Sequence, residues 1–265
     1  MFPQKLLATD PGGRKRRLHA ATNHRRSIRY RGCNLLLRNP RFLDDFGPAR
    51  NFGAYELFKI GVKNVEEEIA LALTLRKQLG PDIMLCADAN MGMTKPNAQR
   101  YVTGAADAGL LFVEQPFRDN DHAGMLALAR MSPIPLCADE SAHSIEALMA
   151  LHAMGAIAGA NLKTIKFGGI VGIMRAAIVA DALGLSVDLA SKTGESSLGA
   201  AALLHLGYAI PNIDWGININ NHYLEHDLIT QPLQQKNGGF DCPVGPGLGV
   251  EVRENIVRRF ALKHK

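Results

Sequence analysis

The sequence is poor in aromatic residues and in cysteine. It contains one Trp, five Tyr and ten Phe among 265 residues, and its four cysteines form no Cys-x-x-Cys pair. It also lacks an apolar run of about 18 residues, the minimum for a membrane-spanning helix. No apolar segment near Met1 suggests a secretory signal. These absences predict a globular protein with reduced thiols, no membrane partner and a cytoplasmic location.

Positive charge is concentrated at the N-terminal end. Residues 1–52 hold 12 Lys and Arg against 3 Asp and Glu, whereas the other 213 residues hold 18 against 22. No helical or strand period is visible in this segment, so we expect a disordered basic leader. No stacking platform of aromatic residues among the basic ones is visible, so nucleic acid is not an expected partner. A transit peptide and an altered gene start are the alternatives.

Three acidic residues and two lysines recur at the ends of short apolar runs. They are Lys59, Asp88, Glu114, Asp139 and Lys163, at intervals of 29, 26, 25 and 24 residues. Each interval suits one strand, one helix and two loops. A TIM (β/α)8 barrel places residues at the same height on successive strands with this period, and its active site lies at the carboxyl ends of the strands. We therefore predict an α/β fold of this type over residues 53–265.

Helical and strand patterns fill the intervals. The expected helices cover residues 65–79, 98–108, 124–131, 144–154, 173–183, 198–208 and 254–262, and the later strands cover 185–190 and 213–217. Gly80 and Gly184 stop two of the helices. Seven strands can be counted in the pattern, and no clear candidate precedes Phe58. The barrel is therefore predicted to be incomplete at its N-terminal end.

The three carboxylates predict a metal site. Asp88, Glu114 and Asp139 supply hard oxygen ligands at consecutive strand ends, a set that suits Mg²⁺ or Mn²⁺. Asn90 and Glu140 follow two of them and are expected to support the ligands from outside. The alternative is that the carboxylates only form ion pairs at the ends of the strands.

Two cysteines precede two of the predicted ligands. Cys86 and Cys137 lie two residues before Asp88 and Asp139, so they face the same way one layer deeper in the barrel. Soft metal ligation is conceivable for a thiol, but we expect both side chains to pack as small apolar groups.

Lys59 and Lys163 flank the carboxylates. Their strands are four apart in the predicted order, on opposite walls of an eight-stranded ring. Near a divalent metal the neutral amine of a lysine becomes accessible, and it can take a proton from a carbon next to a carboxylate. The alternatives are a solvated or ion-paired lysine and a Schiff-base aldolase. Lys166, three residues past Lys163, is expected to point elsewhere and to act only as a supporting residue behind the ligands.

Four motifs resemble the enolase superfamily. They are Val-Glu-Gln-Pro at 113–116, Ala-Asp-Glu-Ser at 138–141, Leu-Lys-Thr-Ile-Lys-Phe-Gly-Gly at 162–169 and Pro-Gly-Leu-Gly at 246–249. Within the superfamily, residues 114–141 are similar to the muconate-lactonizing subgroup of muconate cycloisomerases and mandelate racemase-like enzymes. The resemblance covers residues 53–262.

The resemblance implies an activity and a set of roles. Mg²⁺ would bind to Asp88, Glu114 and Asp139, with Lys59 and Lys163 as the acid/base pair. The reaction would remove a proton next to a substrate carboxylate through an enediolate, in a cycloisomerase, racemase, epimerase or dehydratase. A small carboxylate substrate is implied, and a homo-oligomer is left open. Fold and motifs define this half-reaction and not the product.

Three features depart from the family pattern, and one further residue, Glu195, resembles it. Leu57 replaces the first lysine of the family's Lys-x-Lys, so Lys59 is expected to be a weaker base. Asn218 stands near the place of an acidic residue on the last strand. Glu195 resembles a Glu-Ser loop and is expected either to touch substrate or to cap the following helix. Residues 1–52 replace a capping domain that would exclude water, so a catalytically impaired or binding-only barrel is the alternative function.

Overall fold

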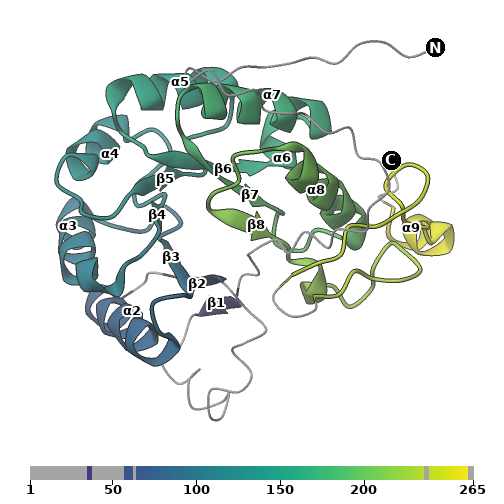
Figure 1. The fold of residues 1–265 in the computed structure, drawn as a ribbon, viewed down its shortest axis with the longest axis horizontal. Coiled ribbons are helices and arrows are strands. Elements are labelled where there is room, and N and C mark those ends of the chain that lie inside the picture. Colours follow the sequence, from purple (N-terminus) through teal and green to yellow (C-terminus); the bar gives the residue numbers. More distant parts are fainter. Residues whose placement is uncertain (1–34, 38–56, 62–63, 236–238, 262–265) are drawn as a thin grey trace, which may run out of the picture.

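The computed structural model describes residues 35–37, 57–61, 64–235 and 239–261. Eight strands form one sheet, and each strand pairs in parallel with the next along the chain. The strands are β1 (Leu35–Leu37), β2 (Leu57–Gly61), β3 (Met84–Asp88), β4 (Val113–Glu114), β5 (Leu136–Ala138), β6 (Gly159–Lys163), β7 (Ser186–Ala190) and β8 (Gly216–Asn218). The sheet is curled and carries its helices on the outside (Figure 1).

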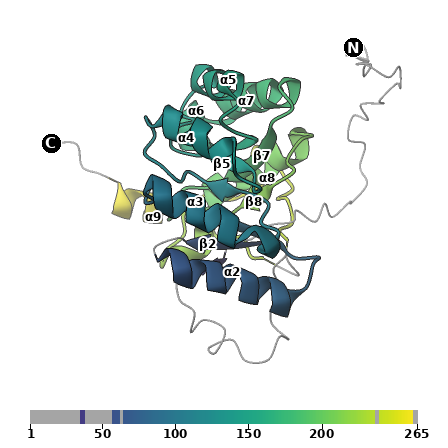
Figure 2. The same ribbon diagram turned by 90° about the vertical axis from the view of Figure 1, so that its left-hand side faces the viewer.

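The helices alternate with the strands as the sequence pattern predicts. They are α2 (Val65–Leu79), α3 (Lys95–Gly104), α4 (His122–Ala129), α5 (Ile145–Met154), α6 (Thr164–Phe167), α7 (Ile170–Ala182), α8 (Ser197–Ala209) and α9 (Glu254–Phe260), with 3₁₀ turns η2 (Ala106–Ala108) and η3 (Asn221–Tyr223). Helices α2, α3 and α4 stack along one side of the sheet (Figure 2). Within the described ranges, no ladder joins β8 back to β1. The predicted incomplete (β/α) barrel is confirmed.

One element was missed. The sequence pattern offered no strand before Phe58, yet Leu36 of β1 pairs with Lys59 of β2. The strand β1 lies inside the segment that we expected to be a leader; its three leucines show no alternation and sit in an Arg-rich stretch, so no period identifies them. The rest of the predicted leader lies outside the described residues.

Helix ends differ from the pattern where local chemistry decides them. Helix α3 begins at Lys95 because Thr94 Oγ1 accepts a hydrogen bond from Asn97 N and a proline stands in the first turn. The expected helix at 98–108 is split, since α3 ends at Gly104 and η2 follows. Helix α2 runs over residues 65–79 as predicted, with acidic residues in its first turn and basic ones in its last, which complements its dipole.

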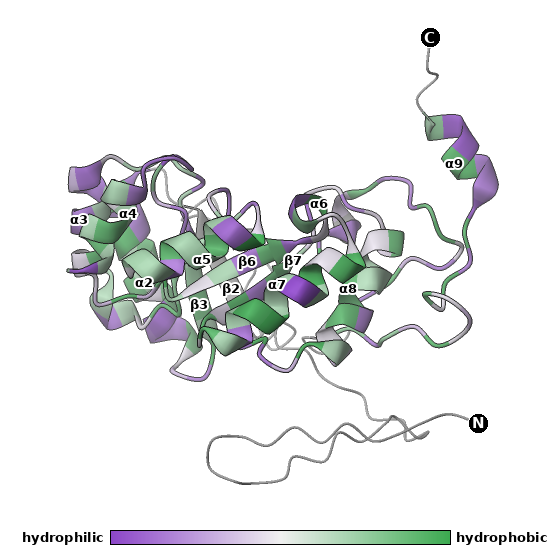
Figure 3. Ribbon diagram, turned by 90° about the horizontal axis from the view of Figure 1, so that it is seen from above, coloured by the Kyte–Doolittle hydropathy of each residue, from purple (hydrophilic) through white to green (hydrophobic). Residues whose placement is uncertain are grey.

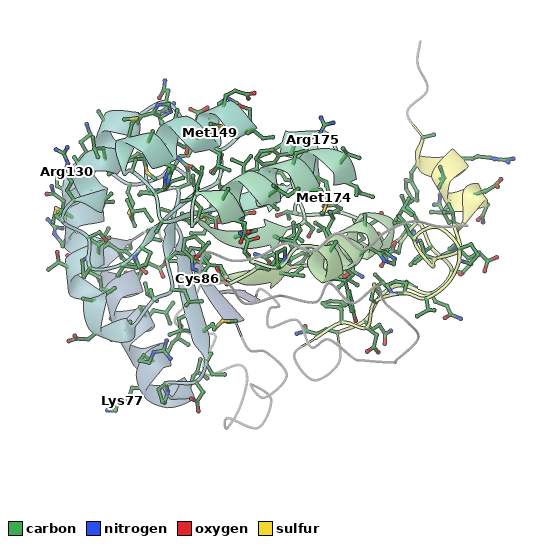
Figure 4. The ribbon with its side chains drawn as sticks, turned by 45° about the horizontal axis from the view of Figure 1, so that its top comes forward. Lys77, Cys86, Arg130, Met149, Met174 and Arg175 are labelled. Carbon is green, nitrogen blue, oxygen red and sulfur yellow. The ribbon has the colours of Figure 1, made fainter. Side chains whose placement is uncertain are left out.

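The sheet separates two apolar regions. On its outer side, residues such as Leu85, Leu162 and Leu189 pack against the helices, of which α7 and α8 carry long hydrophobic stretches (Figure 3). Inside the curl lies a smaller cluster that we call the apolar layer, made of Cys86, Phe112, Cys137 and Trp215. Figure 4 shows Cys86 inside the curl and Met149 and Arg175 on the outer helices.

The apolar layer is closely packed. The rings of Phe112 and Trp215 have centroids 4.5 Å apart. A Cβ added at Gly159 of β6 would come within 2.5 Å of the Trp215 ring, so this position has room only for glycine. Cys86 and Cys137 are thiols rather than disulfide partners, 1% and 0% exposed, and they pack as the sequence predicts.

The segment after β8 is tied to the start of α8. Asp227 accepts a hydrogen bond from Ser197 N at 3.0 Å, while Ser197 Oγ accepts from Asn221 Nδ2 at 2.8 Å and from Leu233 N at 3.0 Å. These bonds satisfy a backbone donor at the first turn of the helix. Across the part of the chain that the structure describes, we find no helix with the length and apolarity needed to span a membrane.

Candidate functional site

The three predicted ligands lie at consecutive strand ends. Asp88 and Glu114 are partners at the last position of the ladder between β3 and β4, and Asp139 directly follows β5. Their exposed fractions are 8%, 0% and 5%. We call these three residues the carboxylate layer, because they occupy the same rim of the curled sheet, above the apolar layer. Their role as metal ligands stays a prediction.

A cavity of about 400 Å³ opens at this rim. It is lined by Asp88, Asn90, Asp139, Glu140, Asn161, Lys163, Ala190, Ser191, Lys192, Thr193, Asn218, Asn220 and Tyr223. These residues come from the carboxyl ends of β3, β5, β6, β7 and β8, or from the loops that follow them. The lining is mostly polar, which suits a small polar or charged ligand.

Two lysines hold the side chain of Asp139. Lys163 Nζ donates to Asp139 Oδ2, and Lys166 Nζ donates to Asp139 Oδ1 at 2.7 Å. Lys166 Nζ also donates to the backbone oxygens of Asp139 at 2.8 Å and Asn161 at 2.6 Å. Burial alone would raise the pKa of Asp139, but the Lys166 and Lys163 ammonium groups outweigh it and hold this pKa below its usual range.

The expectation that Lys166 points elsewhere is wrong, although its bonds to Asp139 agree with the expected place behind the ligands. Helix α6 begins at Thr164, directly after Lys163, so the chain turns and brings Lys166 back over the site. Spacing along a strand therefore does not apply to this residue. Burial lowers the pKa of Lys166, while the Asp139 carboxylate opposes that shift.

Sequence reasoning missed Asn161. Its side chain is fully buried, and its Nδ2 donates to Glu114 Oε1 at 2.8 Å. Asn161 precedes Lys163 by two residues on β6, so the two side chains share one face of the strand. This two-residue spacing is the sequence signal from which Asn161 could have been predicted. Asp188, also fully buried, is its ladder partner on β7 and places another carboxylate inside the barrel.

Two further predicted residues lie at the cavity. The backbone N of Asn90 donates to Asp88 Oδ1 at 2.9 Å, and both Asn90 and Glu140 line the cavity. Glu140 is half-buried. Burial raises the pKa of Glu140, and the nearby Asp139 and Asp88 carboxylates raise it further.

The remaining predicted residues differ in position. Asn218 at the end of β8 is buried and lines the cavity. Glu195 lies in the loop before α8, where its Oε2 accepts from Lys192 N at 2.9 Å, and it is not among the described residues of the cavity lining. Lys59 pairs with Cys86 in the ladder between β2 and β3, and its side chain lies outside the described part of the structure.

The carboxylate layer fits a hard divalent cation in its chemistry. Three carboxylates at adjacent strand ends are the donors that Mg²⁺ prefers. As the side chains stand, no group of three or more His, Cys, Asp or Glu residues in the described ranges is arranged to hold a metal ion. Both oxygens of Asp139 accept hydrogen bonds from lysines, so a metal ion bound there would share these oxygens with the Lys163 and Lys166 ammonium groups.

Sequential parallel strands, outer helices and a polar cavity at the carboxyl ends of the strands define a barrel-type α/β protein. Residues 49–256 match the family described as "Enolase C-terminal domain-like". The chain belongs to this family.

Among the relatives that match are proteins named muconate cycloisomerase and chloromuconate cycloisomerase. The chain is 28% identical to muconate cycloisomerase 1 of Pseudomonas putida over 77% of this chain and 54% of that protein. It is 30% identical to muconate cycloisomerase 1-1 of Acinetobacter lwoffii over 76% of this chain and 53% of that one. The solved muconate lactonizing enzyme of Pseudomonas putida superposes with a TM-score of 0.80 at 26% identity, over 88% of this chain and 66% of that chain. The chain thus spans about half the length of the curated relatives it matches.

Proposed function

We propose that this protein removes a proton from the carbon next to a carboxylate of a small organic acid, in a Mg²⁺-dependent reaction. The observation that carries the proposal is the contact of Lys163 with Asp139 at the cavity, with Asp88 and the buried Glu114 at neighbouring strand ends. The position of the proposed base beside three carboxylates and a polar cavity, at the carboxyl ends of neighbouring strands, supports the proposal.

Lys163 is the proposed base. With its amine neutral, the Nζ lone pair takes the proton from the substrate carbon. The electrons of the broken C–H bond form a C=C bond to the carboxylate carbon, which leaves an enediolate. Lys59, on the strand four places away, is the proposed partner that donates or accepts a proton on the opposite face of the substrate.

Asp88, Glu114 and Asp139 are the proposed ligands of Mg²⁺ or Mn²⁺, and the bound ion would supply positive charge that favours the substrate carboxylate and its developing negative charge. The buried Asn161 keeps Glu114 oriented through the bond from its Nδ2. Asn90 and Glu140 are proposed to support the ligands or to contact substrate, and Glu195 is proposed to act at the edge of the site.

The product class is a finer proposal. Because the matched relatives are named muconate cycloisomerases, a cycloisomerase is the first candidate, followed by a racemase, an epimerase and a dehydratase. A cytoplasmic location and a homo-oligomeric state stay predictions.

The proposal is tested by exchange of substrate protons with solvent. A panel of mono- and dicarboxylic acids is incubated in deuterated water with Mg²⁺ and the protein, and exchange next to the carboxylate is followed by NMR. We expect exchange with the wild type, none with Lys163→Met, and unchanged exchange with Lys95→Met, whose lysine is exposed on α3. No exchange by the wild type would contradict the proposal, and a borohydride-trapped adduct on Lys163 that forms with EDTA present would indicate a Schiff-base aldolase instead.

A second candidate is a catalytically impaired or binding-only barrel. The engagement of both Asp139 oxygens by lysines favours it, because these bonds compete with a metal ion for the same atoms. Saturable binding of a carboxylic acid without any proton exchange is the result expected of this candidate.

A further inference from the structure

The side chain of Gln115 is the centre of a buried hydrogen-bond network. It is fully buried, and its Oε1 accepts three hydrogen bonds, from Asp139 N at 3.0 Å, Ser141 N at 3.1 Å and Ser141 Oγ at 2.8 Å. Its Nε2 donates to Phe117 O at 2.9 Å. The amide thus uses its acceptor for the loop after β5 and a donor for its own loop.

The backbone of Gln115 extends the same network to a third strand. Its N–H donates to Cys137 O of β5 at 2.9 Å, and its carbonyl accepts from Met91 N, in the loop after β3, at 2.8 Å. One residue therefore connects the ends of β3, β4 and β5. These are the strands that carry the carboxylate layer.

Backbone strain is concentrated at the same place. Among the described residues other than glycine, a positive φ occurs at Asn90 (44°), Met91 (62°) and Gln115 (36°). All three lie within three residues of the end of β3 or β4, and two of them are joined by the bond between Met91 N and Gln115 O. Residues with side chains occupy this region at a cost, which persists only where surrounding contacts impose it, often at functional sites.

The contacts of Asp139 divide into two sets. Lysines bond to its carboxylate and to its carbonyl oxygen, whereas Gln115 bonds to its N–H. Loss of a lysine contact from the carboxylate therefore leaves the bond between Gln115 and the Asp139 N–H intact. We propose that Gln115 is a positioning residue, which fixes the backbone of Asp139 relative to Glu114 and Asp88; this inference rests on the proposed function of those carboxylates.

Hydrogen exchange measured by mass spectrometry tests the positioning directly, without metal or substrate. Gln115→Met removes the acceptor of the Asp139 and Ser141 amides at similar side-chain volume. We expect exchange of residues 138–142 to accelerate about tenfold or more. Gln115→Glu keeps an oxygen acceptor for the same donors and is expected to retain the protection. Leu75→Ala, in the buried face of the distant helix α2, is the control for a general loss of stability.

Two results would overturn the inference. One is unchanged exchange of residues 138–142 in Gln115→Met, and the other is an equal acceleration there in Leu75→Ala. If Gln115→Met does not fold, Gln115→Asn takes its place, because its amide is one methylene shorter and no longer reaches the same donors. Unchanged exchange in that variant would be equally contradictory.

Calorimetry with Mg²⁺ separates this inference from the proposed function. We expect wild-type binding to weaken about tenfold or more in Gln115→Met, as for other residues that orient metal ligands. Wild-type binding that Gln115→Met leaves unchanged would overturn the positioning role and leave the proposed function standing. No binding by the wild type would contradict the proposed function, while the exchange experiment would still decide whether Gln115 fixes the Asp139 backbone.

Discussion

On three neighbouring strands, a residue of the apolar layer lies two positions before a residue of the carboxylate layer. Cys86, Phe112 and Cys137 each precede one of the carboxylates, in the order Asp88, Glu114 and Asp139 along the chain. The pleat of a strand turns both members of each pair to the same face, about 7 Å apart along the strand. The same face of the sheet is thus a packed core at one level and a polar site at the next.

The two layers have opposite energetic roles. Burial of Phe112 and Trp215 removes apolar surface from water and stabilises the fold. Burial of carboxylates costs free energy unless cations or hydrogen-bond donors compensate, as Lys163 and Lys166 do for Asp139. The comparison teaches that apolar packing and buried charge are separated by level within one barrel, and variants of each layer can test this separation.

The largest effect on stability is expected in the apolar layer. Phe112→Ala leaves a cavity beside Trp215 and should lower the free energy of unfolding by about 3–5 kcal/mol. Urea unfolding followed by circular dichroism measures this loss. Phe260→Ala, at a residue 53% exposed in α9, is the matched control and should change the free energy by less than about 1 kcal/mol. Equal losses of unfolding free energy in the two variants would contradict the stabilising role of the apolar layer.

A smaller effect is expected for a lysine of the site. Lys166→Met removes charged hydrogen bonds to Asp139 and should cost about 1–3 kcal/mol of unfolding free energy. Lys95→Met breaks an ion pair of 3.5 Å to Asp121 on the surface, where the lysine side chain is 60% exposed, and should cost under about 1 kcal/mol. Thermal and urea unfolding of both variants check the difference, and a larger cost for Lys95→Met would be inconsistent with a buried network at Asp139.

The smallest effect is expected in the order in which the cysteine thiols react. This order does not depend on a change in the free energy of unfolding. In a Cys33→Ser background, Cys242 should react with iodoacetamide before Cys86 and Cys137, which are buried in the apolar layer. Burial raises the pKa of Cys242, so the midpoint of its pH–rate profile should lie above the value of about 8.5 for an unperturbed cysteine. Mass spectrometry of labelled peptides gives the order. Labelling of Cys86 before Cys242 would show that the apolar layer is accessible to the reagent.

The period of polar strand ends was sufficient to predict the fold and the carboxylate layer. Spacing along strands also predicted that Cys86 and Cys137 pack below it. The same reasoning failed for Lys166, because α6 begins directly after Lys163 and a helical turn changes the direction of its side chain.

Two other features depend on information that a single sequence does not display. Strand β1 is recognisable only through its pairing with β2, since three leucines carry no period. Gln115 acts through bonds to loops after three strands, and its positive φ is a tertiary property. Residues of this kind are found by following hydrogen bonds between strand ends.

The most direct test of the separation between layers is calorimetric titration of Mg²⁺ into three proteins. These are the wild type, Asp139→Asn from the carboxylate layer and Cys137→Ala from the apolar layer. We predict saturable binding to the wild type and to Cys137→Ala, and none to Asp139→Asn, provided that circular dichroism shows all three folded. Absence of binding to the wild type, or equal binding to all three, would contradict the assignment of the carboxylate layer as a metal site.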